Sequence, residues 1–158
     1  MFGLNIKTFN GRSAVSLWKW LVFRLFFWVH VDVIGEDSRV ALGPLLVRFE
    51  ILHTRRLRVY LHHIMRSDAE RHLHDHPWSF VSIILRGGYR EHTMDGSRDY
   101  KAPAILFRPA TWAHKLELQQ PAWTLVFATK TVRRWGFLTE KGWCFWRNYD
   151  YTNGGCQE

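Results

Sequence analysis

Cysteine is scarce in this 158-residue chain, which contains only Cys144 and Cys156. Two cysteines exclude a small secreted scaffold held together by several disulfides, and neither belongs to a CxxC pair of the kind that binds zinc. A glycine-rich phosphate loop is also missing, because the Gly87-Gly88 pair fits a hairpin turn and not a GxGxxG motif. These absences favour a cytoplasmic protein whose thiols stay reduced.

Long runs of basic residues are missing as well, although the chain is basic overall. Lys and Arg number 22 against 14 Asp and Glu, which gives a net charge of +8, yet Arg55-Arg56 and Arg133-Arg134 are the only adjacent basic pairs. Nucleic-acid-binding proteins concentrate positive charge on one face or in runs. We therefore do not expect a nucleic acid as a partner. The positive charge is compatible with a solvated surface and with an acidic or phosphorylated small ligand.

The apolar N-terminal stretch from Ala14 to Ile34 contains no uncharged run approaching the roughly 18 residues of a membrane-spanning helix. The residues that interrupt it are Lys19, Arg24, His30 and Asp32. No small-residue cleavage site follows, which argues against a signal peptide. We expect an amphipathic aromatic helix from about Ser13 to Val29 that packs on the domain or on the second copy of a homodimer. Contact with a membrane surface is the less favoured alternative.

After about Gly43 the pattern changes to short extended segments separated by turns such as Asp95-Gly96. The segments predicted as strands are Leu45–Leu52, Leu57–Met65, Trp78–Leu85, Tyr89–Thr93, Ala104–Arg108, Trp112–Leu118, Trp123–Thr129, Trp135–Thr139 and Trp143–Arg147. No helices alternate with them, so the sequence predicts an all-β antiparallel sandwich or barrel. This barrel would cover residues 43–150, between a helical extension over 1–42 and a flexible tail over 151–158.

Three of the nine histidines have a spacing suited to a metal site. His74 and His76 lie two residues apart in a Leu-His-Asp-His-Pro-Trp segment, so on an extended chain their side chains point the same way. His114 follows a turn that contains Pro109, from which it can reach the same point. Imidazole nitrogens bind a divalent transition metal when they converge at about 2.0–2.1 Å from it. We predict that His74, His76 and His114 hold a metal ion.

Other residues are candidates for the wall of a ligand pocket. Arg58, Tyr60 and His62 share one side of the strand Leu57–Met65, and this side lines either a barrel mouth or the solvent. Trp78 belongs either to the core or to a pocket wall, in a chain in which aromatic residues make up 16%.

The sequence allows more than one role for each of two charged residues, Arg108 and Asp75. Arg108 can bind an anionic substrate, although a lone arginine beside a turn is also typical of the surface. Asp75 directly follows His74, so it points to the other side of the strand and does not join the two histidines as a ligand. We interpret Asp75 as a turn residue or as an acceptor for an imidazole N–H.

These features together resemble the cupin superfamily. His74 and His76 match the histidine pair of the first cupin motif, Gly87 or Gly88 its closing glycine, and Pro109 and His114 the second motif. The resemblance covers about Leu45 to Arg147, and the Leu-His-Asp-His-Pro-Trp segment is similar to that of a poorly characterised bacterial or phage-like cupin group. It implies an antiparallel double-stranded β-helix, the jelly-roll barrel, with a metal ion inside.

The sequence departs from the cupin pattern at the glutamate of the first motif, whose place falls on Phe80 or Val81. The fourth ligand of the metal ion would be water, His62, Glu91 or His72. Imidazoles suit Fe(II), Zn, Ni, Cu or Mn without deciding among them. The resemblance implies a small molecule bound beside the ion and the chemistry of a metal-dependent dioxygenase or isomerase. The alternative is a non-enzymatic cupin that binds its small ligand without turnover.

Overall fold

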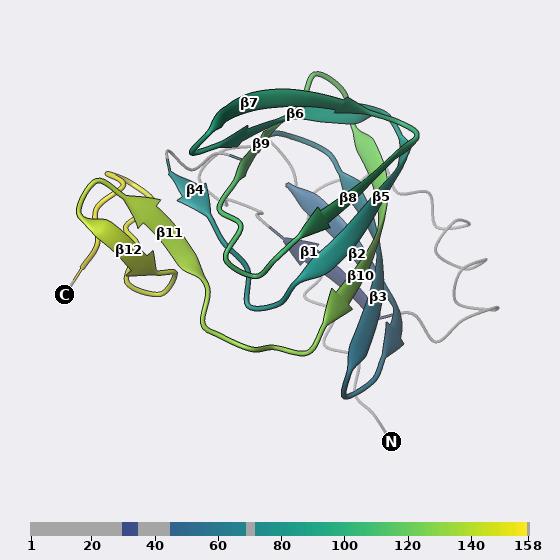
Figure 1. Cartoon of the computed structure of the whole chain (residues 1–158), viewed down its shortest axis with the longest axis horizontal. Coiled ribbons are helices and arrows are strands. Elements are labelled where there is room, and N and C mark those ends of the chain that lie inside the picture. The colour runs from purple at the N-terminus through teal and green to yellow at the C-terminus, as the bar shows by residue number, and fades with distance from the viewer. Residues whose placement is uncertain (1–29, 35–44, 69–71, 158) are drawn as a thin grey trace, which may run out of the picture.

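The chain folds around one large antiparallel sheet and two small ones (Figure 1). The computed structural model describes residues 30–34, 45–68 and 72–157. This part of the chain contains twelve strands and no helix. The strands are β1 (His30–Ile34), β2 (Leu46–His53), β3 (Leu57–Ile64), β4 (Leu73–His74), β5 (Phe80–Arg86), β6 (Gly88–Thr93), β7 (Gly96–Lys101), β8 (Ala104–Arg108), β9 (Lys115–Glu117), β10 (Ala122–Thr129), β11 (Gly136–Thr139) and β12 (Gly142–Phe145).

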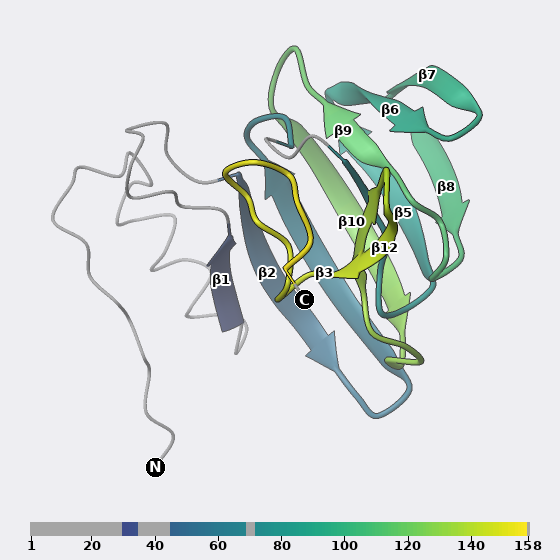
Figure 2. The ribbon, with the colours of Figure 1, turned by 90° about the vertical axis from the view of Figure 1, so that its left-hand side faces the viewer.

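The large sheet has the strand order β1-β2-β3-β10-β5-β8, and its neighbouring strands are antiparallel. β10 lies between β3 and β5, so strands that are distant in the sequence are paired, as in a jelly roll. The β7-β6-β9 sheet lies across one end of the large sheet, and the β12-β11-β4 sheet lies to its side (Figures 1 and 2). The predicted all-β antiparallel class is confirmed.

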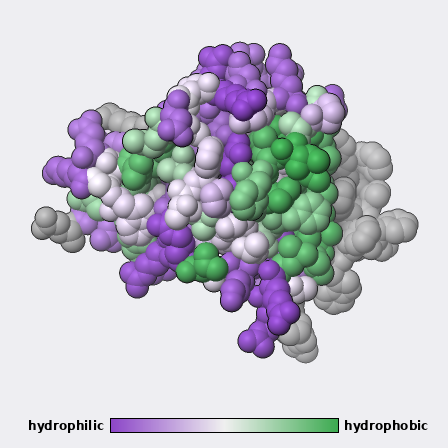
Figure 3. All heavy atoms as spheres, viewed as in Figure 1, coloured by the Kyte–Doolittle hydropathy of each residue, from purple (hydrophilic) through white to green (hydrophobic). Residues whose placement is uncertain are grey.

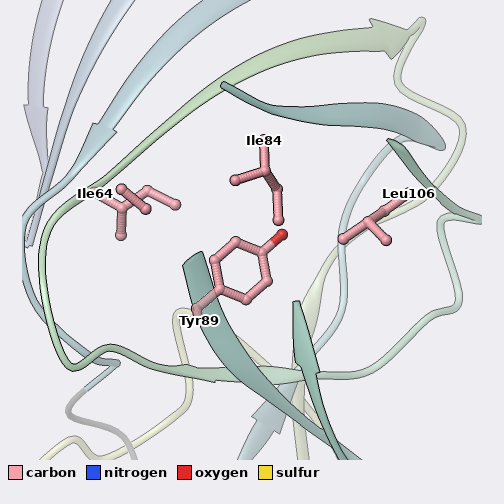
Figure 4. Packing of buried hydrophobic residues seen from close by; sticks show 5 residues of the cluster. Ile64, Ile84, Tyr89 and Leu106 are labelled. Atoms are coloured by element: carbon pink, nitrogen blue, oxygen red, sulfur yellow. The ribbon is translucent and has the colours of Figure 1, made fainter. Parts of the chain in front are cut away.

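A cluster of apolar side chains packs inside the barrel beside β6. Ile64, Ile84, Tyr89 and Leu106 converge from four strands (Figure 4), and Ala122 of β10 completes the cluster. Side chains in a strand alternate between the two faces, so residues two positions away from these point into the barrel as well. The register that buries this core therefore also directs polar side chains of β3, β5 and β8 into the interior.

The predicted strands are all present, with ends that differ by a few residues. The largest difference is in Trp112–Leu118, of which only Lys115–Glu117 forms a strand, because the Trp112 N–H donates to the Pro109 carbonyl at 2.9 Å in a turn. β7 was not predicted because most of its residues are polar or charged and it faces solvent over much of its length.

The expectation of a helical extension over residues 1–42 is wrong for part of that range. His30–Ile34 forms the edge strand β1, which pairs with β2 and extends the large sheet (Figure 2). The alternation of exposed and half-buried residues in β1 suits such an edge. The helix expected from Ser13 to Val29 lies outside the described residues. Within the described part of the chain, no helix has the length and hydrophobicity needed to cross a bilayer.

The tail expected to be flexible is fastened to the fold. Cys156 forms a disulfide with Cys144 of β12, so the expectation of reduced thiols is also wrong for this structure. The backbones of Tyr149 and Cys156 form a β-bridge, and the Tyr149 ring stacks on Phe137 with 3.9 Å between ring centres. These contacts bury aromatic area in addition to forming the covalent bond, so the segment is attached to the fold at more than one point. The cytoplasmic location stays a prediction.

Candidate metal centre

Backbone pairing between two distant segments sets the positions of the three predicted ligands. His74 ends β4, and His114 forms an isolated bridge opposite it, in which each N–H donates to the other residue's carbonyl at 2.9 Å. Residues directly opposite in such a pair carry their side chains on the same face. His76 follows two residues after His74, so its side chain returns to that face. The structure thus brings together the three imidazoles that the sequence indicated.

This set of imidazoles could hold a metal ion. One possible ligand atom from each of His74, His76 and His114 lies within 4.8 Å of the others. The Nε2 atoms of His76 and His114 are 2.8 Å apart. Two nitrogens bound at right angles to one ion, each at about 2.1 Å, would lie about 3.0 Å apart. The donor spacing therefore fits a transition-metal ion, whose identity the donor set leaves open.

Glu91 of β6 orients His114 and neutralises Arg108. Its Oε1 accepts hydrogen bonds from His114 Nδ1 at 2.6 Å and from Arg108 Nε at 2.9 Å, and its Oε2 accepts from Arg108 Nη2. Trp112 Nε1 also donates to Oε1, at 3.2 Å. Because Nδ1 of His114 carries the proton, its Nε2 presents a lone pair to the centre. Glu91 thus supports a candidate ligand, instead of being the fourth ligand itself.

Burial keeps the imidazoles of His74 and His76 neutral. It lowers the pKa of His74 to about 4, against an opposing effect of Asp68, and it lowers the pKa of His76 well below the usual range. Burial alone would raise the pKa of Glu91, but hydrogen bonds from His114 and Arg108 outweigh it and lower this pKa to about 2. Neutral imidazole is the form that binds metal, so His74 and His76 are ready to do so at neutral pH.

Asp75 points away from the histidines and fastens the β11–β12 hairpin. Its Oδ1 accepts a hydrogen bond from the Gly136 N–H at 2.7 Å, and its Oδ2 accepts from Trp143 Nε1 at 2.9 Å and from Arg133 Nη1. The expected imidazole donor is not among these partners. Asp75 therefore contacts none of the three imidazoles and supports the centre by anchoring the segment that carries His74 and His76.

The other residues considered as a further ligand also have partners elsewhere. His72 Nδ1 lies 3.0 Å from the Tyr149 hydroxyl, and His62 Nε2 accepts a hydrogen bond from Arg48 Nε at 3.1 Å. At the motif glutamate, Phe80 faces inward, with its ring centre 4.9 Å from that of His76. Among the described residues, the possible metal-binding group consists of the three histidines alone.

The predicted pocket residues of β3 face the barrel interior. Tyr60 is buried with Val126 and Ala128, and Trp78 packs against this cluster. The ring centres of Tyr60 and Trp78 are 6.5 Å apart, and Arg58 Cζ lies 5.6 Å from the centre of the Trp78 ring. The alternative of a fully solvated face for this strand is therefore wrong, because Tyr60 is buried and Trp78 and Phe80 pack against it.

Arg108 is neither on the surface nor free to bind a ligand. Its side chain is 9% exposed, is engaged by Glu91, and has Cζ 4.6 Å from the centre of the Trp112 ring. Its place beside a turn suggested exposure, but position 108 lies on the inward face of β8, two residues after Leu106 of the core.

Sequence reasoning missed Arg48, which lies on β2 opposite His62 of β3. The alternation within Leu45–Leu52 places Arg48 on one side of its strand, which is a usable signal. What the sequence alone lacks is the register between β2 and β3, and that register puts Arg48 beside His62.

A cleft of about 360 Å³ opens behind the histidines, on the side to which Asp75 points. Arg133, Trp112 and Trp143 contribute to its walls, together with Met94 at the tip of the β6–β7 hairpin. Arg133 is neutralised there by Asp75. The cleft therefore has apolar and aromatic walls but no uncompensated charge from this arginine.

Comparison with solved structures shows that the chain has the cupin fold. A cupin 2 conserved barrel domain protein from Rhodopseudomonas palustris gives a TM-score of 0.58 over 73% of this chain and 81% of its own, at 13% identity. The polyketide cyclase RemF from Streptomyces resistomycificus gives 0.51 over 71% and 82%, at 16% identity. The iron(II) form of HppE gives 0.53 over 64% and 56%, at 10% identity.

These likenesses concern the fold and not the reaction. No protein-family model and no curated protein matches the sequence. Identities of 10% to 16% to the solved structures allow many different sites on one barrel.

Proposed function

We propose that this protein is a metal-binding cupin. His74, His76 and His114 hold one divalent transition-metal ion, and a small molecule binds beside the ion in the barrel. The observation that carries this proposal is the convergence of the three imidazoles within 4.8 Å, together with the hydrogen bond from His114 Nδ1 to Glu91. A carboxylate that holds one ring nitrogen of a histidine is the usual support of a metal ligand.

A metal-dependent dioxygenase or isomerase is the activity that this site supports best. Three protein ligands leave coordination positions for water or substrate, which is characteristic of catalytic metal sites and not of structural ones. A divalent ion, whether Fe, Zn, Ni or Mn, would supply Lewis-acid chemistry, and a redox-active one would also bind O₂. The chain's own contribution is to hold the donors, to fix the His114 tautomer through Glu91, and to limit access of water by burial.

A non-enzymatic cupin is the second candidate, and the missing motif glutamate favours it. Phe80 stands where that carboxylate belongs, so the charge of the ion is not reduced by a carboxylate ligand. Such a module would bind its ligand without converting it. Incubating metal-loaded protein with each ligand it binds, followed by mass spectrometry of the ligand, separates the two, because any product removes this candidate.

Metal analysis of purified protein tests the proposal. We expect about one equivalent of a divalent ion after incubation with Fe, Ni, Mn or Zn, and a loss of most of it in His114→Ala. His53→Ala is the control, because His53 is exposed, its imidazole pairs with Glu50, and it is outside the three-histidine group. Metal below about a tenth of an equivalent in the wild type, whichever ion is added, would contradict the proposal.

We also propose that the protein is a homodimer that associates through the outer face of the large sheet. Cα partners form an apolar row across this face: Ile105, Ile83, Leu125, Leu61 and Phe49. Ile105 is 73% exposed, and Figure 3 shows a broad apolar area around β5 and β8. A twofold dimer buries the same patch of both copies.

Light scattering tests the proposed dimer. It should give a dimer for the wild type and a monomer for Ile105→Glu, and a monomeric wild type would contradict the proposal.

A further inference from the structure

Arg48 of β2 is a half-buried cation held in place by two neutral side chains. Its Nε donates a hydrogen bond to His62 Nε2 at 3.1 Å, and its Cζ lies 4.8 Å from the centre of the Tyr60 ring. Burial, with a contribution from the charge of Arg48, lowers the pKa of His62 to about 3, so this imidazole is neutral at neutral pH. These contacts orient the guanidinium group without neutralising its charge.

The nearest carboxylates are engaged by histidines. Asp32 is the Cα partner of Arg48 on β1, but its Oδ1 pairs with His30 Nε2 at 3.1 Å. Glu50, two residues further along β2, pairs with His53 at 3.1 Å. Burial lowers the pKa of Arg48, and Asp32 and Glu50 oppose this effect from a distance by favouring its charged form, but among the residues that the structure describes no carboxylate lies within the 4.0 Å of an ion pair with Arg48.

Three other arginines of the described chain show the alternative arrangement, in which an acidic partner neutralises the cation. Arg90, Arg108 and Arg133 each pair with a carboxylate, from Asp99, Glu91 and Asp75 respectively. Removing a cation from water without a counter-ion costs free energy. Arg48 pays this cost, although an aliphatic residue would fill the same place without it. A ligand that brings the missing negative charge explains the arrangement.

A line of packed side chains connects the guanidinium group of Arg48 on β2 with the candidate metal centre. Tyr60, beneath Arg48, belongs to one cluster with Trp78 and Phe80. The Phe80 ring in turn lies 4.9 Å from His76. Trp78, Phe80 and His76 are each half-buried, so solvent reaches this line of side chains.

We propose that Arg48 is the anion-binding residue of this barrel, and that the small molecule bound beside the metal carries a carboxylate or phosphate group. This inference rests on the proposed function. The two terminal nitrogens of a guanidinium match the paired oxygens of such a group, and a bidentate contact is stronger than a neutral hydrogen bond. The ligand places its anionic group on Arg48 and a second donor toward the ion at His74, His76 and His114.

Calorimetric titration of the metal-loaded protein tests this assignment. The probes are oxalate, malonate, succinate, inorganic phosphate and glycerol 3-phosphate, with malonamide and glycerol as neutral analogues. We expect at least one anion to bind about tenfold more tightly than its neutral analogue. The carboxylate and phosphate arms identify which chemistry the site takes.

Variants locate the binding. Arg48→Met keeps the aliphatic stem and should weaken anion binding by about 10- to 100-fold while the metal content stays unchanged. Arg48→Lys keeps the charge without the planar fork and should fall between Arg48→Met and the wild type. Arg55→Met removes the same charge from the exposed β2–β3 hairpin and should alter binding less than about twofold.

The outcomes separate the two proposals. Equal anion affinity in the wild type and Arg48→Met, or no anion binding at all, overturns the assignment of Arg48 whatever the metal content. Anion binding that depends on Arg48 in a protein that takes up no metal would contradict the proposed function and leave the anion site standing.

Discussion

Two walls of the barrel interior differ in how their arginines are neutralised. On the wall formed by β6 and β8, Arg108 and Glu91 form a buried pair that also holds His114. On the wall formed by β2 and β3, Arg48 has only the neutral partners His62 and Tyr60. The first wall satisfies its charges within the protein and positions a candidate ligand of the metal. The second leaves its cation without a direct ion pair among the described residues, so the guanidinium group stays available to an anion.

Substituting each arginine in turn tests the difference between the two walls most directly. Arg108→Met leaves the Glu91 carboxylate buried without its cation, and we expect a loss of about 3–5 kcal/mol in the free energy of unfolding. Arg48→Met removes a cation that has no counter-ion, so we expect a change of no more than about 1 kcal/mol, in either direction. Denaturant unfolding followed by fluorescence measures both. Equal losses in the two variants would show that the walls do not differ.

The two walls also respond to acid in different pH ranges. Folding lowers the pKa of His62 from 6.5 to about 3, so the unfolded chain alone takes up this proton as the pH falls below 6.5, and stability is lost. Folding lowers the pKa of Glu91 from 4.5 to about 2, so its contribution is complete above pH 4.5 and is lost only below it.

Between pH 6.5 and 4.5, then, acid acts on the wall of β2 and β3 and leaves Glu91 ionised. Lowering the pH across this interval should reduce the free energy of unfolding of the metal-free wild type. We expect the reduction to be about 2–3 kcal/mol smaller in His62→Gln. His74 and His76 titrate equally in both proteins, so the difference isolates His62. Parallel stability curves for the two proteins would contradict the low pKa of His62.

Loss of the Glu91 carboxylate should weaken metal binding without removing a candidate ligand. In Glu91→Gln the amide no longer provides an anionic acceptor for His114 Nδ1, and we expect the metal affinity to fall about 10- to 100-fold. Competition with a chromophoric chelator measures this change. Glu117→Gln is the matched control, because the Glu117 carboxylate also holds a histidine, His92 at 2.8 Å, but one outside the three-histidine group. An unchanged metal affinity in Glu91→Gln would show that the orientation of His114 does not depend on this carboxylate.

Much of the centre could be predicted from the sequence because it depends on local periodicity. The two-residue spacing of His74 and His76 fixes their common direction on any extended chain, and the proline turn before His114 marks where the second segment enters. The roles of Glu91 and Arg48 could not be predicted in this way. Each depends on which strands are neighbours and in what register, and that is decided by packing across the whole barrel.

The dependence on contacts between distant segments also explains why the predictions for both ends of the described chain were wrong. The edge strand His30–Ile34 is stabilised by its ladder with β2, and not by its own sequence. The disulfide between Cys144 and Cys156 depends on the tail folding back, which no spacing rule predicts.

Phe80 lies between the two walls, so substituting it tests metal binding and anion binding together. Its ring packs against His76 on one side and belongs to the Tyr60 cluster beneath Arg48 on the other. Phe80→Glu would introduce a carboxylate beside the histidines, and we expect metal affinity to rise about tenfold, since an anionic ligand offsets the charge of the ion. The same carboxylate would give Arg48 a counter-ion, so binding of the anionic probes should weaken. Phe80→Gln separates charge from shape: an equal gain in metal affinity there would show that relief of steric crowding, and not charge, is responsible.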